Sequence, residues 1–273
     1  MAIAFYKGSD LIKTIYKGTT SIVTSYDGLS AIEQVIYNTD PLGWWDANDY
    51  TSGTTWYDRT SNSYDLTLAN PSFYSYDTST LGNASFLFST GSLATNGGRA
   101  TTAQVVMSWD ADISFTYIEI LRPANVPLPS NPSTFTLQSG TSITSTPVTS
   151  NRIYTTLFGG NSYYLNAHTY DSSKTSFVAR RVQSGFNNVN NKLKVSYGDN
   201  LSTSLTHYGA GDFTGSGDVN YTFTYLTTRI GHSANNGQTY PAYYAVSLVY
   251  NKILTDSEIE LIYSYYRHQY GLL

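Results

Sequence analysis

The sequence predicts an all-β protein built as an antiparallel β-sandwich. Three observations lead to this prediction: many short runs of β-branched and aromatic residues, turn clusters of Gly, Asn, Ser and Pro between them, and almost no helical periodicity before the C-terminal end. Of the 273 residues, 40% are hydrophobic, which is enough to bury a full core. Only 12% are charged, whereas 15% are aromatic, so hydroxyl and amide groups carry most of the polarity.

The N-terminal residues 1–40 contain a repeat with a period of ten. The repeated positions are the tyrosines of Tyr-x-Gly triplets, Tyr6, Tyr16 and Tyr26, and the isoleucines Ile12, Ile22 and Ile32. Each unit is predicted to be a short strand that ends in a Gly-containing turn. Such a segment cannot be stable alone, so these side chains must pack either on the main domain's own sheet or on another subunit.

Beyond this repeat, short strands follow one another from Leu42 onward. The clearest lie at residues 54–57, 66–68, 85–88, 114–121, 152–154, 163–165, 176–179, 192–195 and 221–225. A proline-rich stretch at 123–132 is predicted to be a surface crossover, because strand patterning resumes on both sides of it. We therefore expect an N-terminal segment of residues 1–40 and one main domain of residues 41–273.

One helix is predicted near the C-terminus. Thr255 and Glu258 form a capping box, in which each side chain satisfies a backbone amide that the first turn leaves unpaired. Apolar and aromatic residues follow at helical spacing, namely Ile259, Ile262, Tyr263, Tyr266 and Tyr270. Gly271 stands where a left-handed cap ends such a helix.

Both ends of the main domain resemble a known family. Residues 43–49 read Gly-Trp-Trp-Asp-Ala-Asn-Asp, and residues 56–66 read Trp-Tyr-Asp-Arg-Thr-Ser-Asn-Ser-Tyr-Asp-Leu. They resemble the opening of concanavalin A-like, laminin-G-like jelly-roll domains, and residues 243–258 and 266–272 are similar to the family's last strands and final helix. The family's usual Ser-Gly turn is Ser61-Asn62 here, and Asn tolerates the left-handed conformation nearly as well as Gly. The resemblance implies a jelly roll, a fold that hosts lectins, glycosidases, adhesion modules and virion parts alike.

The decad repeat resembles hairpin repeats at the start of tailed-bacteriophage structural proteins. Residues 1–7 have neither a basic region nor a continuous apolar one, so we expect no Sec-type export signal, and no apolar run is long enough to span a membrane. The chain has no Cys, which excludes disulfides and thiolate chemistry. The net charge of −4 and the absence of a basic cluster disfavour nucleic-acid binding.

Catalytic chemistry finds little support in the sequence. Retaining glycosidases need two carboxylates about 5–5.5 Å apart, yet Glu119 has no acidic neighbour along its strand and Glu258 belongs to the helix cap. The histidines, His168, His207, His232 and His268, show no zinc spacing. We therefore predict no catalytic residue and no enzymatic activity.

Calcium is the one cofactor that the sequence leaves open. Asp46, Asn48 and Asp49 form an oxygen-rich loop, as does the segment 212–218, although Asx turns and strand caps use the same residues. Trp44, Trp45 and Trp56 could stack on a sugar, but core packing is favoured for them. Adjacent tyrosines such as Tyr163-Tyr164, Tyr243-Tyr244 and Tyr265-Tyr266 cannot share one face of a strand, so some tyrosines are expected at an interface or a glycan site.

The leading hypothesis is a non-enzymatic structural protein on the surface of a phage virion, assembled in the host cytoplasm. It would serve as a head fibre, a capsid decoration protein or a tail-associated adhesin. The six repeated residues Tyr6, Ile12, Tyr16, Ile22, Tyr26 and Ile32 would dock it onto capsid or tail proteins, while the jelly roll projects and aids attachment to a host glycan. Homo-oligomerisation is left open. The alternative is a free carbohydrate-binding lectin module.

Overall fold

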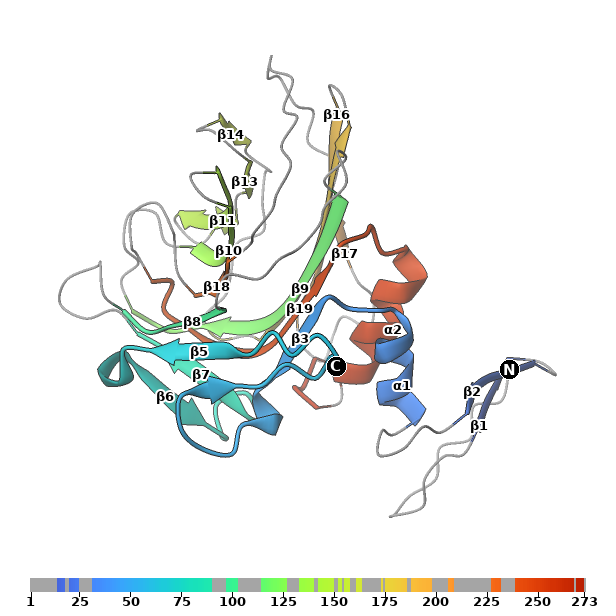
Figure 1. The fold of residues 1–273 in the computed structure, drawn as a ribbon, viewed down its shortest axis with the longest axis horizontal. Helices are drawn as coiled ribbons and strands as arrows, with labels where there is room; N and C mark the ends of the chain where they lie inside the picture. Colours follow the sequence, from blue (N-terminus) through green and yellow to red (C-terminus); the bar gives the residue numbers. More distant parts are fainter. Residues whose placement is uncertain are drawn as a thin grey trace.

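The computed structural model describes residues 14–17, 20–24, 31–89, 97–102, 114–126, 133–139, 142–149, 152–153, 155–157, 161–163, 173, 175–185, 188–197, 206–208, 227–231, 239–267 and 269–272. Within them, two antiparallel sheets face one another and two helices cover the outer face of one sheet, as Figure 1 shows. The sandwich predicted from the sequence is therefore confirmed. No helix in these ranges is long and apolar enough to cross a membrane.

The first sheet contains nine strands in the described part of the chain. From one edge they are β4 (Thr55–Trp56), β5 (Leu66–Ala69), β8 (Arg99–Thr102), β18 (Thr227–Ile230), β10 (Ser133–Ser139), β11 (Ser142–Thr149), β13 (Thr155–Leu157) and β14 (Asn161–Tyr163), with β12 (Arg152–Ile153) beside β11. Three neighbouring pairs in this order, β5–β8, β8–β18 and β18–β10, join strands that are distant in sequence, and the chain crosses to the second sheet between their members.

The second sheet contains eight strands in the same part of the chain. From one edge they are β6 (Tyr74–Asp77), β7 (Ser85–Phe88), β19 (Ala242–Tyr250), β9 (Ser114–Pro123), β15 (Ser176–Gly185), β16 (Asn188–Tyr197) and β17 (Thr206–Tyr208), with β3 (Gly43–Asp46) also paired to β19. The short helical turns η1 (Ala47–Asp49) and η2 (Pro71–Phe73) precede β4 and β6, respectively. Of the proline stretch predicted as a surface crossover, Pro123 is the buried last residue of β9, and residues 127–132 lie outside the described residues.

Strand β19 connects the two ends of the main domain. It pairs with β9 along one edge, while β7 and β3 share its other edge. The register with β9 shifts between Tyr244 and Val246, which places a β-bulge at Ala245. Before the bulge Tyr244 faces the core between the sheets; after it, Ala245 and Val246 both face the helices. Alternation along β19 lets one strand serve two cores, and the bulge shifts that alternation by one residue.

The inter-sheet core is rich in aromatic rings. Trp45 and Trp56 meet Phe86, Phe88 and Tyr244 there, all fully or almost fully buried. Gly43 has no room for a side chain, because a Cβ at that position would collide with the ring of Trp45. All three tryptophans of the family-like motif are buried, as core packing predicted, and adjacent Trp44 and Trp45 point to opposite faces of β3.

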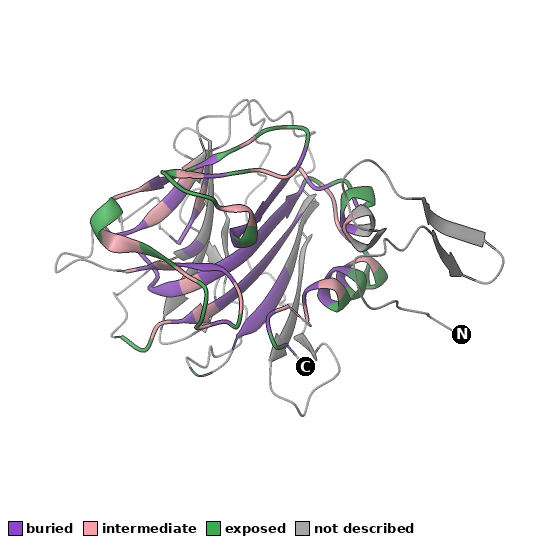
Figure 2. Ribbon diagram, turned by 90° about the horizontal axis from the view of Figure 1, so that it is seen from below, coloured by how far each residue is buried: buried purple, intermediate pink, exposed green. Residues whose placement is uncertain are grey.

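A helix-side core lies between the second sheet and helices α1 (Ala31–Asn38) and α2 (Asp256–Tyr266). Its helical members are Ile36, Ile259, Ile262, Tyr263 and Tyr266. They pack on buried side chains of β3, β9, β15 and β19, so this sheet is covered on both faces (Figure 2). As the alternation of adjacent tyrosines requires, Tyr243 packs toward these helices and Tyr244 toward the other sheet.

Helix α2 has the predicted capping box. The Thr255 side chain accepts from the Glu258 amide, and the Glu258 carboxylate accepts from the Thr255 amide at 2.6 Å. Although partial burial alone would raise the pKa of Glu258, the bonds from Thr255 and the charge of Lys252 lower it. Gly271 is left-handed, as expected, but it lies in the turn that follows the helix.

The N-terminal prediction holds only in part. Strands β1 (Thr14–Lys17) and β2 (Thr20–Thr24) form an antiparallel two-stranded sheet that, in the part of the chain the structure describes, is separate from both sheets of the sandwich. The third repeat unit is not a strand: Ile32 lies in helix α1, and Ile36 of that helix enters the helix-side core. The prediction of a β segment up to residue 40 is therefore wrong for residues 31–38, because Ile36 has helical spacing to other apolar residues and can bury its side chain on the sheet.

Candidate functional site

The turn at residues 56–65 positions the polar site. One oxygen of Asp58 accepts from the backbone amides of Trp44 (2.9 Å) and Thr60 (3.0 Å), and the other accepts from the Thr60 hydroxyl and the Tyr64 amide. The Arg59 amide donates to the Trp44 carbonyl at 2.8 Å. These bonds hold the turn against β3 and place the Arg59 side chain over it. The turn survives as expected, but its left-handed residue is Ser63 rather than Asn62.

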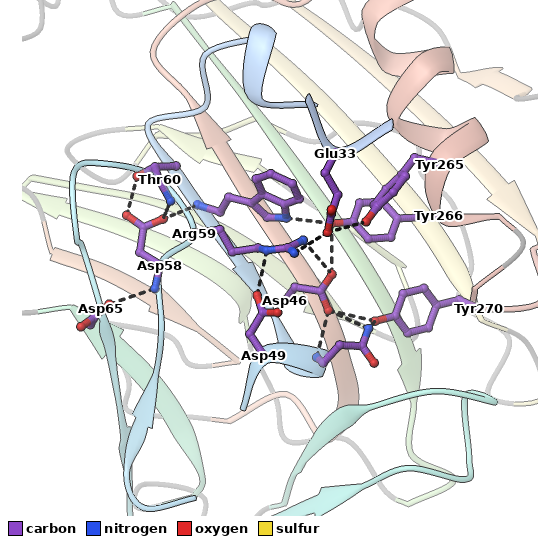
Figure 3. A network of polar contacts seen from close by, with 12 residues as sticks. Glu33, Asp46, Asp49, Asp58, Arg59, Thr60, Asp65, Tyr265, Tyr266 and Tyr270 are labelled. Carbon is purple, nitrogen blue, oxygen red and sulfur yellow. Dashed lines mark hydrogen bonds and ion pairs between the residues drawn. The ribbon is translucent and has the colours of Figure 1, made fainter. Parts of the chain in front are cut away.

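Arg59 lies at the centre of a cluster that we call the Arg59 network (Figure 3). Its Nη2 is 2.6 Å from Glu33, its Nε 2.8 Å from Asp49 and its Nη1 3.8 Å from Asp46. The guanidinium carbon also lies 4.3 Å from the centre of the Trp44 ring, a cation–π distance. All three nitrogens of the guanidinium thus face carboxylates of this chain.

Tyrosines from the C-terminal end close the network. The Tyr266 hydroxyl accepts from the Trp44 indole at 2.7 Å and donates to Asp46 at 3.3 Å. The Tyr270 hydroxyl donates to the other oxygen of Asp46, also at 3.3 Å. Tyr265 donates to Glu33 at 3.4 Å. The site therefore joins α1, β3, η1, the 56–65 turn and the region of α2.

Burial sets the protonation of these groups. Desolvation raises the pKa of Asp46, against the bonds from Asn48 and the charge of Arg59, and it also raises that of Asp49. Burial alone would lower the pKa of Arg59, but the charges of Asp49 and its neighbours raise it overall, so Arg59 stays protonated. Burial and then the charge of Asp46 raise the pKa of Tyr266 well above its usual value.

The predicted calcium residues lie in this network. Asp46 Oδ1 accepts from the Asn48 amide at 3.0 Å and from its side chain at 2.8 Å, and Asp49 pairs with Arg59. The Asp49 contact is a charge pair without an aligned hydrogen bond, because Oδ2 is close to Nε but has no hydrogen-bond partner. Across the described ranges, no three His, Asp or Glu side chains are grouped so that they could hold a metal. The calcium site stays a prediction, and the structure gives the same oxygens internal partners.

The other predicted residues are spread over the chain. Of the docking residues, Tyr16 lies in β1, Ile22 in β2 and Ile32 in α1. Tyr6, Ile12 and Tyr26 lie outside the described residues, as do the loop 212–218, the strand predicted at 221–225 and three of the histidines, His168, His232 and His268. His207 is in β17.

Glu119 occupies a second polar position, between the two sheets. It is fully buried and accepts from the Tyr117 hydroxyl at 2.9 Å and from Thr134 of the opposite sheet at 3.0 Å. Such a carboxylate connects the two layers and is closed to a polymeric substrate.

The sequence analysis did not single out Arg59 or Glu33. One signal was present: in a chain with only 12% charged residues, Arg59 stands directly after the Asp that anchors the family-like turn. Nothing in the sequence pairs it with Glu33, because that pair depends on a helix where a strand was predicted. The ion pairs and hydrogen bonds of the Arg59 network thus hold together elements that are distant in sequence.

No known protein family and no curated protein matches the chain. Among solved structures, a mutant of the Trypanosoma rangeli sialidase that displays trans-sialidase activity is similar, with a TM-score of 0.52 and 12% identity over 86% of this chain and 34% of the sialidase. The receptor-binding domain of botulinum neurotoxin type G has a TM-score of 0.52 and 14% identity over 82% of this chain and 51% of that one. The binding domain of botulinum neurotoxin DC, solved with rat synaptotagmin II, has a TM-score of 0.53 and 14% identity, covering 84% and 52%.

The chain thus spans about a third of the sialidase and about half of each toxin chain. At such low identities the similarity establishes a common β-sandwich fold, in agreement with the two sheets described above.

Proposed function

We propose that this chain is a non-catalytic binding module on the surface of a bacteriophage virion, held to capsid or tail proteins through its N-terminal hairpin. The observation that carries the proposal is that, among the described strands, β1 and β2 pair with each other and with no strand of either large sheet. Of the two partners that the repeat requires, the main domain's own sheet and another subunit, this arrangement favours another subunit. Tyr16 and Ile22 lie on the two strands that would dock.

The state of the carboxylates supports a role without catalysis. Glu33, Asp46 and Asp49 face Arg59, Asp58 accepts three bonds within its own turn and one from the Trp44 amide of β3, and Glu119 is buried between the sheets. A general acid or base must reach the reacting group of a bound substrate. These five side chains are instead engaged inside the fold.

The docking role is tested with Ile22→Asp in the full-length chain, which places a charge on β2. We expect the unchanged protein to co-sediment with particles of the phage that encodes it and the Ile22→Asp protein to stay in solution. Leu261→Asp is the matched control, because Leu261 is an exposed apolar residue of α2 outside the hairpin. Equal co-sedimentation of the wild-type and Ile22→Asp chains would contradict the anchor.

A free carbohydrate-binding module is the second candidate. It is favoured by partly exposed tyrosines, of which Tyr76 is 40% exposed, beside the inter-sheet core. This candidate becomes the leading one if the chain binds a soluble sugar saturably while Ile22→Asp changes neither its mass in solution nor its association with particles.

A further inference from the structure

Aromatic rings gather where the edges of the two sheets meet. Strand β4 is the edge of the first sheet and β6 is the edge of the second. The Trp56 ring of β4 lies 4.9 Å from that of Phe86, which also contacts Tyr76 of β6 at 5.6 Å. Tyr50, which follows η1, lies 4.9 Å from both Tyr76 and Phe86. We call these four rings, together with Tyr74 of β6, the aromatic mouth.

Exposure is graded across the aromatic mouth. Phe86 and Trp56 are fully buried, Tyr50 and Tyr74 are half-buried, and Tyr76 is 40% exposed. The rings thus form a continuous path from the inter-sheet core to solvent. The buried Phe86 ring packs on Trp56 and contacts both Tyr50 and Tyr76. A ligand that stacks on Tyr76 therefore meets side chains that are already ordered.

Polar groups line the same place. The Tyr50 hydroxyl donates to the Gly53 carbonyl at 2.8 Å, and the Tyr74 hydroxyl reaches the same oxygen at 3.5 Å. Nothing lies within 4 Å of the position that a Cβ of Gly53 would occupy, so the loop leaves open space there. Aromatic faces with several hydroxyl groups suit a ring that itself carries hydroxyl groups.

The residues of the aromatic mouth carry no positive charge. None of them is Lys or Arg, so an anionic sugar would find no cationic partner among them, whereas a neutral pyranose needs none. Burial raises the pKa values of Tyr76 and Tyr74, so both phenols stay neutral.

We propose that the aromatic mouth is a binding site for a neutral pyranose, with the sugar ring stacked on Tyr76 and its hydroxyls bonded to Tyr50, Tyr74 and the Gly53 loop. This inference rests on the proposed function, since it names the ligand class of a binding module. It requires no metal and no covalent step.

The test is saturation-transfer NMR on the full-length chain with four neutral probes, the methyl pyranosides of glucose, galactose, mannose and N-acetylglucosamine, and with sialyllactose as the anionic probe. We expect transfer to at least one neutral probe and none to sialyllactose. Tyr76→Ala should weaken the binding about tenfold, which corresponds to ~1.4 kcal/mol. Tyr50→Phe keeps the ring and removes the hydroxyl, and should weaken it by a smaller factor.

Tyr57→Ala is the matched control, because Tyr57 is 46% exposed, follows Trp56 directly and takes no part in the aromatic mouth. No transfer to any neutral probe, binding of sialyllactose alone, or equal binding by the wild-type and Tyr76→Ala chains would each overturn the inference. Co-sedimentation of the same proteins with particles separates the two proposals. A chain that binds particles but no sugar leaves the virion role standing and the sugar site refuted.

Discussion

Arg59 shows how one side chain can connect distant parts of this fold. Its side chain is 18% exposed, and it faces Glu33 of α1, Asp46 of β3 and Asp49 of η1. Carboxylates gathered in a partly desolvated place repel one another, and the shared guanidinium offsets that repulsion. We infer that the network holds the helix-side layer to the sandwich.

Replacement of Arg59 by Met should be strongly destabilising. It leaves the carboxylates of the network without their cation, and loss of one partner of a buried ion pair typically costs 3–5 kcal/mol. Because the site keeps some access to water, we expect a loss of about 2–3 kcal/mol in the free energy of unfolding, measured by urea denaturation. Lys252→Met is the control: Lys252 pairs with Glu258 at 3.7 Å on the surface, and its loss should cost under about 1 kcal/mol.

The raised pKa of Asp46 predicts a pH dependence of defined sign. The folded chain holds the Asp46 proton more tightly than the unfolded chain, whose value is 3.8. The wild-type protein should therefore gain stability relative to Asp46→Asn as the pH falls from neutral toward 3.8.

Asp77 provides the opposite case. Burial alone would raise its pKa, but bonds from the amides and hydroxyls of Thr80 and Ser79 lower it below 3.8. Relative to Asp77→Asn, the wild-type protein should lose stability as the pH falls below 3.8. Unfolding free energies of the two variants and the wild type across this range check both signs, and a flat difference for Asp46→Asn would refute the assigned protonation.

At the scale of elements, strand β19 and helix α2 organise the second sheet. Strand β19 presents alternate side chains to the two cores, with a shift of one residue at the Ala245 bulge, and α2 covers the core on the outer face. The sequence located α2 because a capping box and helical spacing are local signals. It missed α1, because the Gly-containing decad repeat favoured strands over the same residues. The sequence did not predict the bulge either, because a bulge is defined by the register of β19 against β9.

The capping box yields a prediction for α2. Thr255→Ala removes the hydroxyl that accepts from the Glu258 amide, and we expect it to cost about 1 kcal/mol. Ser257→Ala changes an exposed residue of the same turn and should have almost no effect. Chemical denaturation of both variants measures the difference, and an equal effect of the two changes would argue against the cap as a stabilising element.

At the scale of the whole molecule, the chain forms three layers of two sheets and a pair of helices (Figure 1). The inter-sheet core and the helix-side core both depend on β19, so the sandwich and the helices should unfold together. The helix α1 belongs to this unit through Ile36 and Glu33. Among the described strands, those of the N-terminal hairpin pair only with each other.

Two truncations test this division. Removal of residues 1–30 keeps α1 and should leave the melting temperature nearly unchanged. Removal of residues 1–40 deletes Ile36 and Glu33, and we expect a loss of about 3 kcal/mol, or roughly 6–12 °C in melting temperature. Circular dichroism melts of both proteins beside the full-length chain give the answer. If both truncations melt alike, α1 is not part of the cooperative unit.

The sequence by itself determined the fold class, the strands β4, β5, β7, β9, β15 and β16 and the capped C-terminal helix, because alternation, turn residues and caps act over a few neighbouring residues. It also placed Trp44, Trp45 and Trp56 in the core. Only the tertiary structure decided that Glu33, Asp46, Asp49 and Arg59 meet, that Ala245 forms a bulge and that tyrosines gather at the meeting edges of the sheets. These contacts join residues far apart in the chain, so they depend on the order of the strands and on the packing of the layers. Neither of these is encoded in any single stretch of sequence.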